Sequence, residues 1–224
     1  MTLRTRRRDA ASGRTKSLAV LLHGYGADGA DLIGLADMLA PALPDTVFIA
    51  PDAPQRCSVN PMGYQWFPIP WIDGSSEAAM QAGFRAAAAT LDAWLSETIV
   101  AEGLTAARTA LLGFSQGAMM SLHVAPRRPD PVAAIVAFSG RYMEAAEEGP
   151  ILSKPPILLT HGDRDEVIPV GALHEARAAL GAQGFELRWH VSPGVGHGIG
   201  PDALALAAEF LAPRLRGAAA IAEA

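Results

Sequence analysis

The sequence predicts an α/β fold with a mostly parallel sheet that helices cover on both faces. Two observations carry this prediction: short apolar runs recur along the chain, and longer segments with apolar residues at helical spacing lie between them. Continuous apolar runs are typical of strands buried on both faces, and strands that alternate with helices favour parallel pairing. The 224 residues show no repeat, linker or break in composition, so we expect one domain over residues 1–224.

Six segments are predicted strands because each is a short, largely apolar run of strand-forming residues, and three of them end at glycine or proline. They are residues 17–22, 46–51, 109–114, 132–138, 156–162 and 187–194. Five segments with helical spacing lie between or after them: residues 28–43, 75–103, 116–125, 170–184 and 201–215. Asp28 is a candidate N-cap for the first of these helices. Ser75 or Ser76 is a candidate N-cap for the second, which we expect to end at Gly103.

Composition and charge exclude several classes of protein. Charged residues make up 18% of the chain and the net charge is −5, which argues against a nucleic-acid partner. No apolar stretch approaches the length of a membrane span, so stable membrane insertion is not expected. Cys57 is the only cysteine, so no internal disulfide or thiolate metal cluster can form, and we expect a cytoplasmic protein. The arginine-rich start precedes too short an apolar run for a signal peptide, so residues 1–16 are expected to be a frayed N-terminus.

One long connection, residues 52–74, carries no predicted helix or strand. It is rich in proline and aromatic residues, and its aromatic content argues against disorder. Long irregular connections in compact domains are usually functional, so we predict a loop that lines a substrate pocket. A loop that only packs its aromatic residues on the sheet edge is the alternative. The residues expected to bind substrate are Met62, Trp66, Phe67, Ile69 and Trp71.

The stretch Gly113-Phe114-Ser115-Gln116-Gly117 ends an apolar strand and opens a helix. This strand–turn–helix context is the one in which a Gly-x-Ser-x-Gly motif presents a nucleophilic serine. Glycines on both sides of the serine let neighbouring backbone come close. The helix that follows directs its free N–H groups at developing negative charge. Ser115 is therefore a candidate nucleophile.

A serine nucleophile needs a base, and the base needs an acid that orients it. His197 lies in a glycine-rich loop after the last predicted strand, where an α/β fold places catalytic groups. Asp163 and Asp165 follow the strand before it, and Asp163 can be read as a turn cap. Ser115, Asp165 and His197 then occur in the chain order of an α/β-hydrolase triad.

An acyl-transfer site also needs two N–H donors for the oxyanion. The backbone of Gln116, directly after the nucleophile, is the first candidate. Tyr25, in the glycine-rich loop after the first apolar strand, is the second candidate. His23, at the start of that loop, is interpreted as a structural residue and not as a second base.

The segments LLHGYGADGADLIGLA, GFSQGAMMSLHVA, FSGR, THGDRDEVIPV and VGHGI resemble the carboxylesterase, acyl-protein thioesterase and phospholipase family of small α/β-hydrolases. The similar segments run from about residue 17 to 212. The resemblance implies Ser115 as nucleophile, Asp165 as triad acid and His197 as base, with backbone donors at Tyr25 and Gln116. Tyr25 stands where thioesterase members often carry leucine, which leaves the preferred acyl group open.

These expectations describe a serine esterase that needs no metal or organic cofactor. The apolar loop favours small-molecule esters with neutral acyl groups of short to medium length. A thioester, such as an acylated cysteine, and a lysophospholipid are the alternative substrates. The same triad could serve a peptidase or a carbon–carbon-bond hydrolase, and a non-catalytic ligand-binding protein on this fold is a further alternative. An exposed aromatic loop could also form the face of a homodimer.

Overall fold

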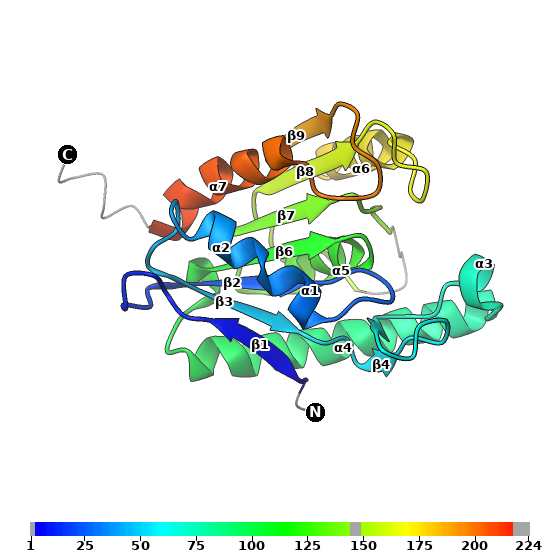
Figure 1. Ribbon diagram of the computed structural model, residues 1–224, viewed down its shortest axis with the longest axis horizontal. Helices are drawn as coiled ribbons and strands as arrows, with labels where there is room; N and C mark the ends of the chain where they lie inside the picture. Colours follow the sequence, from blue (N-terminus) through cyan, green and yellow to red (C-terminus); the bar gives the residue numbers. More distant parts are fainter. Residues whose placement is uncertain (1–2, 144–148, 217–224) are drawn as a thin grey trace.

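The computed structural model describes residues 3–143 and 149–216 and contains a seven-stranded sheet in the order β1-β3-β2-β6-β7-β8-β9 (Figure 1). Six strands run parallel, and each matches a predicted segment to within a few residues. They are β2 (Ser17–Leu22), β3 (Thr46–Pro51), β6 (Thr109–Phe114), β7 (Ala134–Phe138), β8 (Ile157–Gly162) and β9 (Leu187–Ser192). The predicted α/β fold with a mostly parallel sheet is confirmed, and the parallel strands end at one edge of the sheet.

The seventh strand, β1 (Thr5–Arg8), lies at the sheet edge and pairs antiparallel with β3. The expectation of a frayed segment over residues 1–16 is therefore wrong for this strand, while residues 1–2 lie outside the described part. Leu3 is buried, and Arg8 pairs with Asp37 at 2.5 Å. Ladder hydrogen bonds to β3 and an ion pair stabilise a strand that its four polar residues did not indicate.

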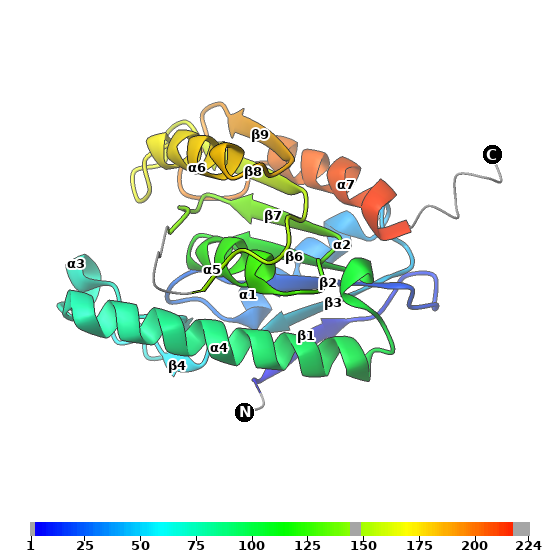
Figure 2. The same cartoon turned by 180° about the vertical axis from the view of Figure 1, so that it is seen from behind.

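Helices cover both faces of the sheet, as the alternating pattern predicted. In Figure 1 the near face carries α1 (Gly29–Ile33), α2 (Leu35–Leu39) and α7 (Pro201–Arg216). Figure 2 shows α4 (Glu77–Ala101), α5 (Gln116–Val124) and α6 (Gly171–Ala182) on the other face. Each layer has its own apolar core, because successive strand residues point to opposite faces of the sheet.

Two predicted helix starts are confirmed and one predicted helix is divided. The Asp28 carboxylate accepts from Ala30 N–H at 2.8 Å, and Ser76 caps α4. The segment predicted as one helix over residues 28–43 breaks at Gly34 into α1 and α2. A short 3₁₀ turn at Ala106–Arg108 precedes β6, and another at Ala125–Arg127 follows α5.

The connection over residues 52–74 forms an arm that projects beyond the sheet beside the start of α4 (Figure 1). It is more regular than the sequence indicated, because it contains β4 (Gln55–Arg56), β5 (Tyr64–Gln65) and α3 (Pro70–Asp73). β4 and β5 pair as a small antiparallel hairpin. The arm is thus a folded unit attached to the carboxyl-terminal edge of the sheet.

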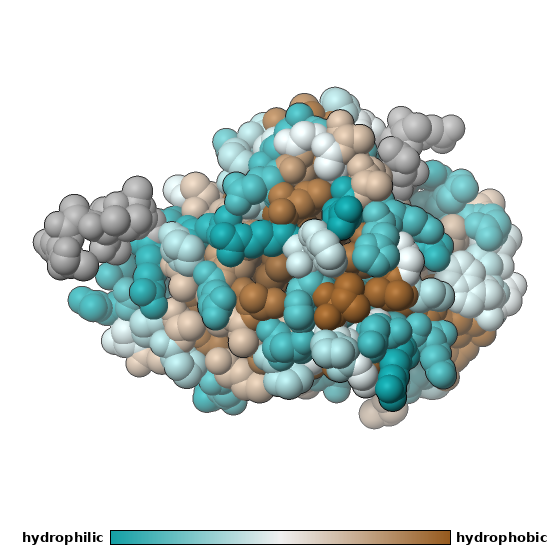
Figure 3. Space-filling model, turned by 90° about the horizontal axis from the view of Figure 1, so that it is seen from above, coloured by the Kyte–Doolittle hydropathy of each residue, from teal (hydrophilic) through white to brown (hydrophobic). Residues whose placement is uncertain are grey.

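The molecular surface is mixed in polarity. Seen from above β9, hydrophilic side chains surround several smaller hydrophobic areas (Figure 3). Among residues 3–143 and 149–216, no helix combines the length and the apolar character that crossing a bilayer requires.

Candidate active site

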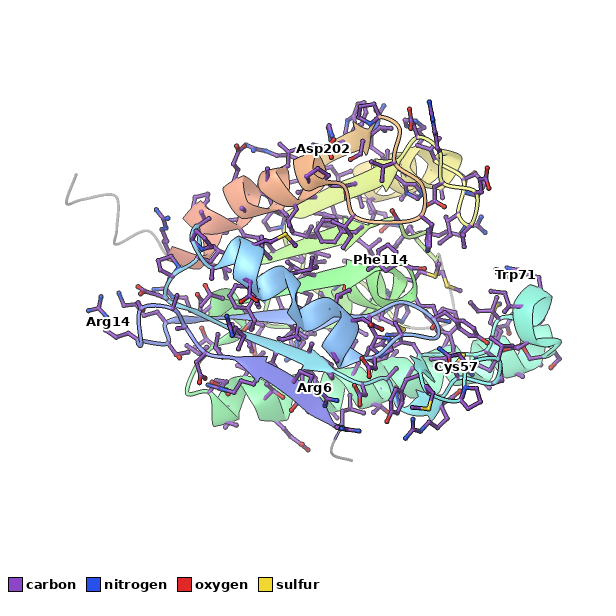
Figure 4. The ribbon with its side chains drawn as sticks, viewed as in Figure 1. Arg6, Arg14, Cys57, Trp71, Phe114 and Asp202 are labelled. Carbon is purple, nitrogen blue, oxygen red and sulfur yellow. The ribbon has the colours of Figure 1, made fainter. Side chains whose placement is uncertain are left out.

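Ser115 occupies a strained turn between β6 and α5. Its φ of 53° and ψ of −114° lie in a region that residues with a side chain rarely adopt. The turn is held because Ser115 N–H donates to the Phe138 carbonyl at 2.9 Å. Figure 4 shows Phe114, its neighbour, at the carboxyl end of β6. Backbone strain of this kind is typical of a functional position and presents the hydroxyl at the sheet edge.

The three predicted triad side chains meet at this edge. His197 Nε2 lies 3.0 Å from Ser115 Oγ, and His197 Nδ1 lies 2.8 Å from Asp165 Oδ2. The Asp165 side chain is fully buried, while 19% of the His197 side chain is exposed. A buried carboxylate, a partly exposed histidine and a serine hydroxyl form a hydrogen-bonded chain, through which the histidine can take the proton of the hydroxyl.

Asp165 has three hydrogen-bond partners, which are His197 and two backbone N–H groups, and it lies beside a histidine that the sequence analysis missed. Oδ1 accepts from Val167 N–H at 2.9 Å and from Ile168 N–H at 2.8 Å. Oδ2 lies 3.2 Å from His161 Nε2, which donates to the Ile168 carbonyl at 2.7 Å. His161 therefore fixes the Ile168 peptide, whose N–H donates to Asp165, and packs against the carboxylate. Its place at the end of β8, four residues before Asp165, was the available signal.

The loop that carries His197 is anchored on both sides of the histidine. Asp163 Oδ1 accepts from Gly194 N–H at 2.6 Å, which makes this aspartate the turn cap that the sequence suggested. Ser139 donates its hydroxyl to the Gly198 carbonyl at 3.0 Å from the end of β7. Asp202, at the start of α7 (Figure 4), accepts from Ser192 at the end of β9 at 2.9 Å. These contacts fix the loop around His197.

Two backbone N–H groups lie near the nucleophile, one in the loop after β2 and one at the start of α5. A Cβ at Gly24 would lie 3.3 Å from Ser115 Cβ, so the loop with Tyr25 passes directly beside the serine. Gln116 opens α5 immediately after the serine. Within residues 3–143 and 149–216, neither the Tyr25 nor the Gln116 N–H has an acceptor. Both amides are therefore available to a ligand oxygen, as an oxyanion hole requires.

His23 is a buried structural residue, as the sequence analysis interpreted it. Its Nδ1 donates to the Gly24 carbonyl at 2.7 Å, and its Nε2 accepts from Ala53 N–H at 2.9 Å. Burial lowers the pKa of His23, which keeps the ring neutral and suits one donating and one accepting nitrogen. The ring thereby connects the Tyr25 loop to the start of the arm.

The side chain of Gln116 has a task that the sequence analysis did not assign to it. Its Oε1 accepts from Trp66 N–H at 3.0 Å, and its Nε2 donates to the Phe67 carbonyl at 2.8 Å. All four groups are buried. The sequence analysis considered only the backbone N–H of Gln116, whereas its side chain also fastens the arm to the nucleophile turn.

We expect Gln116→Ala to lower the free energy of unfolding by about 2–3 kcal/mol, because it leaves two buried backbone groups unpaired. Urea unfolding followed by tryptophan fluorescence measures the change. Gln81→Ala, at an exposed position of α4, is the control and should change stability by less than about 0.5 kcal/mol. Equal losses of stability in the two variants would contradict the inference that the Gln116 side chain fastens the arm.

The five residues predicted to bind substrate do not form one lining. Trp66, Phe67 and Ile69 are buried, with Trp66 donating its indole N–H to the His23 carbonyl at 3.0 Å. Met62 is 82% exposed and Trp71 is 73% exposed. Figure 4 shows Trp71 at the far end of the arm. The arm therefore packs some of its apolar residues into the core and exposes others to solvent, with Trp71 at its far end.

Fold and site together define a class: the protein is a carboxylic ester hydrolase with the α/β-hydrolase fold. The phospholipase/carboxylesterase family model matches residues 9–214, and the chain belongs to this family.

Named relatives agree with this assignment. The crystal structure of esterase PE8 is 45% identical, superposes with a TM-score of 0.86, and is matched over 94% of this chain and 98% of that one. Esterase YpfH of Escherichia coli is 29% identical, over 88% of this chain and 82% of its own length. Acyl-protein thioesterase 1 of Neurospora crassa is 28% identical, over 92% of this chain and 89% of its own length.

Proposed function

We propose that the protein hydrolyses carboxylic esters of short to medium acyl chains through an acyl-enzyme on Ser115. The observation that carries the proposal is the pair of contacts of His197. One ring nitrogen is 3.0 Å from the Ser115 hydroxyl and the other is 2.8 Å from the Asp165 carboxylate. This arrangement suits a base that takes the serine proton and is stabilised when it becomes positively charged.

The reaction follows in two steps from these positions. Ser115 Oγ attacks the ester carbonyl carbon while His197 Nε2 takes its proton, and the N–H groups of Tyr25 and Gln116 hold the oxyanion. The carbonyl–oxygen bond to the alcohol then breaks, and His197 returns the proton to the leaving alkoxide. Water repeats the sequence on the acyl-enzyme and releases the acid.

The burial of the arm's aromatic residues supports shorter acyl chains. Trp66 and Phe67 fill space beneath the arm and pack on His23 and Phe84, with ring centroids 5.7 Å and 5.1 Å apart. A long acyl chain would have to displace these rings or lie along the surface. Small-molecule esters therefore fit the proposal best.

A second candidate function is hydrolysis of thioesters on acylated protein. The relative named acyl-protein thioesterase 1 favours it. The family description names phospholipase beside carboxylesterase, so a lysophospholipid is kept in the proposal as a further substrate class. A cytoplasmic location is part of the proposal, because the single cysteine allows no internal disulfide. Homodimer formation through the exposed residues of the arm stays a proposal.

Labelling with a fluorophosphonate, which reacts with activated serines, tests the nucleophile. Wild-type protein should be labelled and the Ser115→Ala variant should not. An unlabelled wild type, or equal labelling of both, would overturn the proposal.

Turnover of an ester, a thioester and an amide of one acyl group then ranks the substrate classes. A chain-length series of p-nitrophenyl esters should fall off beyond medium length, and a flat series would contradict the acyl preference.

A further inference from the structure

We propose that Asp73 is a positioning residue for the oxyanion hole, acting through the phenol of Tyr25. The inference rests on the proposed function, because it concerns the N–H that Tyr25 offers to the oxyanion. Asp73 ends α3 on the arm, 48 residues from Tyr25 along the chain. The side chain of one oxyanion donor is thus tied to a separate folded element.

The tether is a cluster of hydrogen bonds around one carboxylate oxygen. Tyr25 O–H donates to Asp73 Oδ2 at 3.2 Å, and the Ile69 N–H donates to the same oxygen at 2.9 Å. Ser58 Oγ lies 3.4 Å from this oxygen and 3.1 Å from the phenol oxygen. The other oxygen, Oδ1, accepts from Ser75 N–H at 2.9 Å. Backbone donors on both oxygens hold the carboxylate still, so it is a fixed point for the phenol.

The protonation states suit a lasting tether. Burial by itself would raise the pKa of Asp73, but hydrogen bonds from Ser75, from backbone N–H groups and from Tyr25 lower it to about 2. Burial raises the pKa of Tyr25 to about 12. Carboxylate and phenol are therefore acceptor and donor across the neutral range, and the bond does not switch with pH near 7.

The Tyr25 peptide needs such a restraint because its neighbours are glycines. Gly24 precedes it and Gly26, with a φ of +76°, follows it, so the backbone on both sides is unusually permissive. Beyond Tyr25 the loop is fixed: Gly26 N–H donates to the Tyr64 carbonyl at 2.8 Å, and Asn60 donates to the Gly26 carbonyl at 2.8 Å. The phenol adds a restraint at the residue of this loop whose N–H is proposed to hold the oxyanion.

The phenol contact could instead serve only to hold the arm against the body. That role predicts lost stability with unchanged chemistry once the protein is folded. A positioning role predicts a slower chemical step, because an oxyanion donor that is slightly displaced stabilises the transition state less. Measurements of kcat and of affinity for transition-state analogues therefore distinguish the two roles.

The test is a double-mutant cycle of Tyr25→Phe, Asp73→Asn and the double variant, assayed on a short p-nitrophenyl ester. We expect each single variant to lower kcat about tenfold with KM changed less than about twofold. The double variant should be no slower than Asp73→Asn alone, because either change removes the tether. Affinity for a trifluoromethyl ketone, whose adduct places an oxyanion in the hole, should fall by the same factor as kcat.

Asp92→Asn is the matched control, since it neutralises a hydrogen-bonded carboxylate on α4 that pairs with Arg128. It should keep wild-type kcat. Phenylalanine retains the ring of Tyr25, so Tyr25→Phe decides the matter by itself if Asp73→Asn does not fold. If wild type is active and labelled on Ser115 while Tyr25→Phe keeps its kcat within twofold, or the two effects multiply, the inference is wrong and the proposed function stands. If wild type cleaves no ester and Ser115 is unlabelled, both are wrong.

Discussion

Asp165→Asn should lower kcat for ester hydrolysis by about 10⁴-fold while the protein stays folded. The reason lies in the three donors around the carboxylate. Oδ1 accepts from the N–H groups of Val167 and Ile168, so an asparagine must place its oxygen there. Its NH₂ group then faces His197 Nδ1, which lies 2.8 Å from Oδ2 in the wild type.

An NH₂ group facing Nδ1 makes that nitrogen an acceptor and moves the ring proton of His197 to Nε2. The nitrogen 3.0 Å from Ser115 then carries a hydrogen and cannot take the serine proton. Steady-state kinetics with a p-nitrophenyl ester measures the loss, and circular dichroism checks the fold. Asp163→Asn is the matched control, because its remaining oxygen can still accept from Gly194 N–H. It should keep activity within about tenfold of wild type, and comparable losses in both variants would contradict Asp165 as the triad acid.

The sequence predicted the sheet and the relative order of the site residues because both depend on local patterns. Apolar runs such as Ser17–Leu22 are buried at every position in the structure, and that burial is what their composition indicates. Glycines on either side of Ser115 and an aspartate and a histidine after later strands are equally local signals. Parallel strands that end at one edge then bring these residues together without further information.

What the sequence did not predict depends on contacts between distant segments. Thr5–Arg8 reads as a polar terminus, and only its ladder with β3 makes it a strand. Trp66 and Trp71 are the same residue type and lie only five residues apart, yet Trp66 is buried and Trp71 is exposed. Their difference arises because Gln116, 50 residues away, fixes the backbone at Trp66. A hydrogen bond between residues so far apart in the chain produces no periodic pattern from which the sequence could predict it.

Gly117→Ala should lower the free energy of unfolding by at least about 3 kcal/mol and abolish most ester hydrolysis. A Cβ at this position would lie 1.9 Å from the Leu22 carbonyl oxygen and 2.8 Å from that of His23. These are backbone atoms of β2 and of the loop that leads to Tyr25, so a change of rotamer cannot relieve the contact. The helix that carries Gln116 must shift away from β2, which moves one proposed oxyanion donor relative to the other.

Gly34→Ala separates this steric effect from the general cost of replacing glycine. Gly34 joins α1 to α2 with a φ of −59°, and a Cβ there meets nothing within 4 Å. Because alanine restricts the unfolded chain, Gly34→Ala should leave stability unchanged or raise it by up to about 1 kcal/mol. Urea unfolding and ester kinetics on both variants decide the point. A Gly117→Ala variant as stable and active as Gly34→Ala would mean that α5 does not need its close approach to β2. The glycine after the nucleophile would then have no packing role, and the strained turn at Ser115 would have to be maintained by Gly113 and the contact to Phe138 alone.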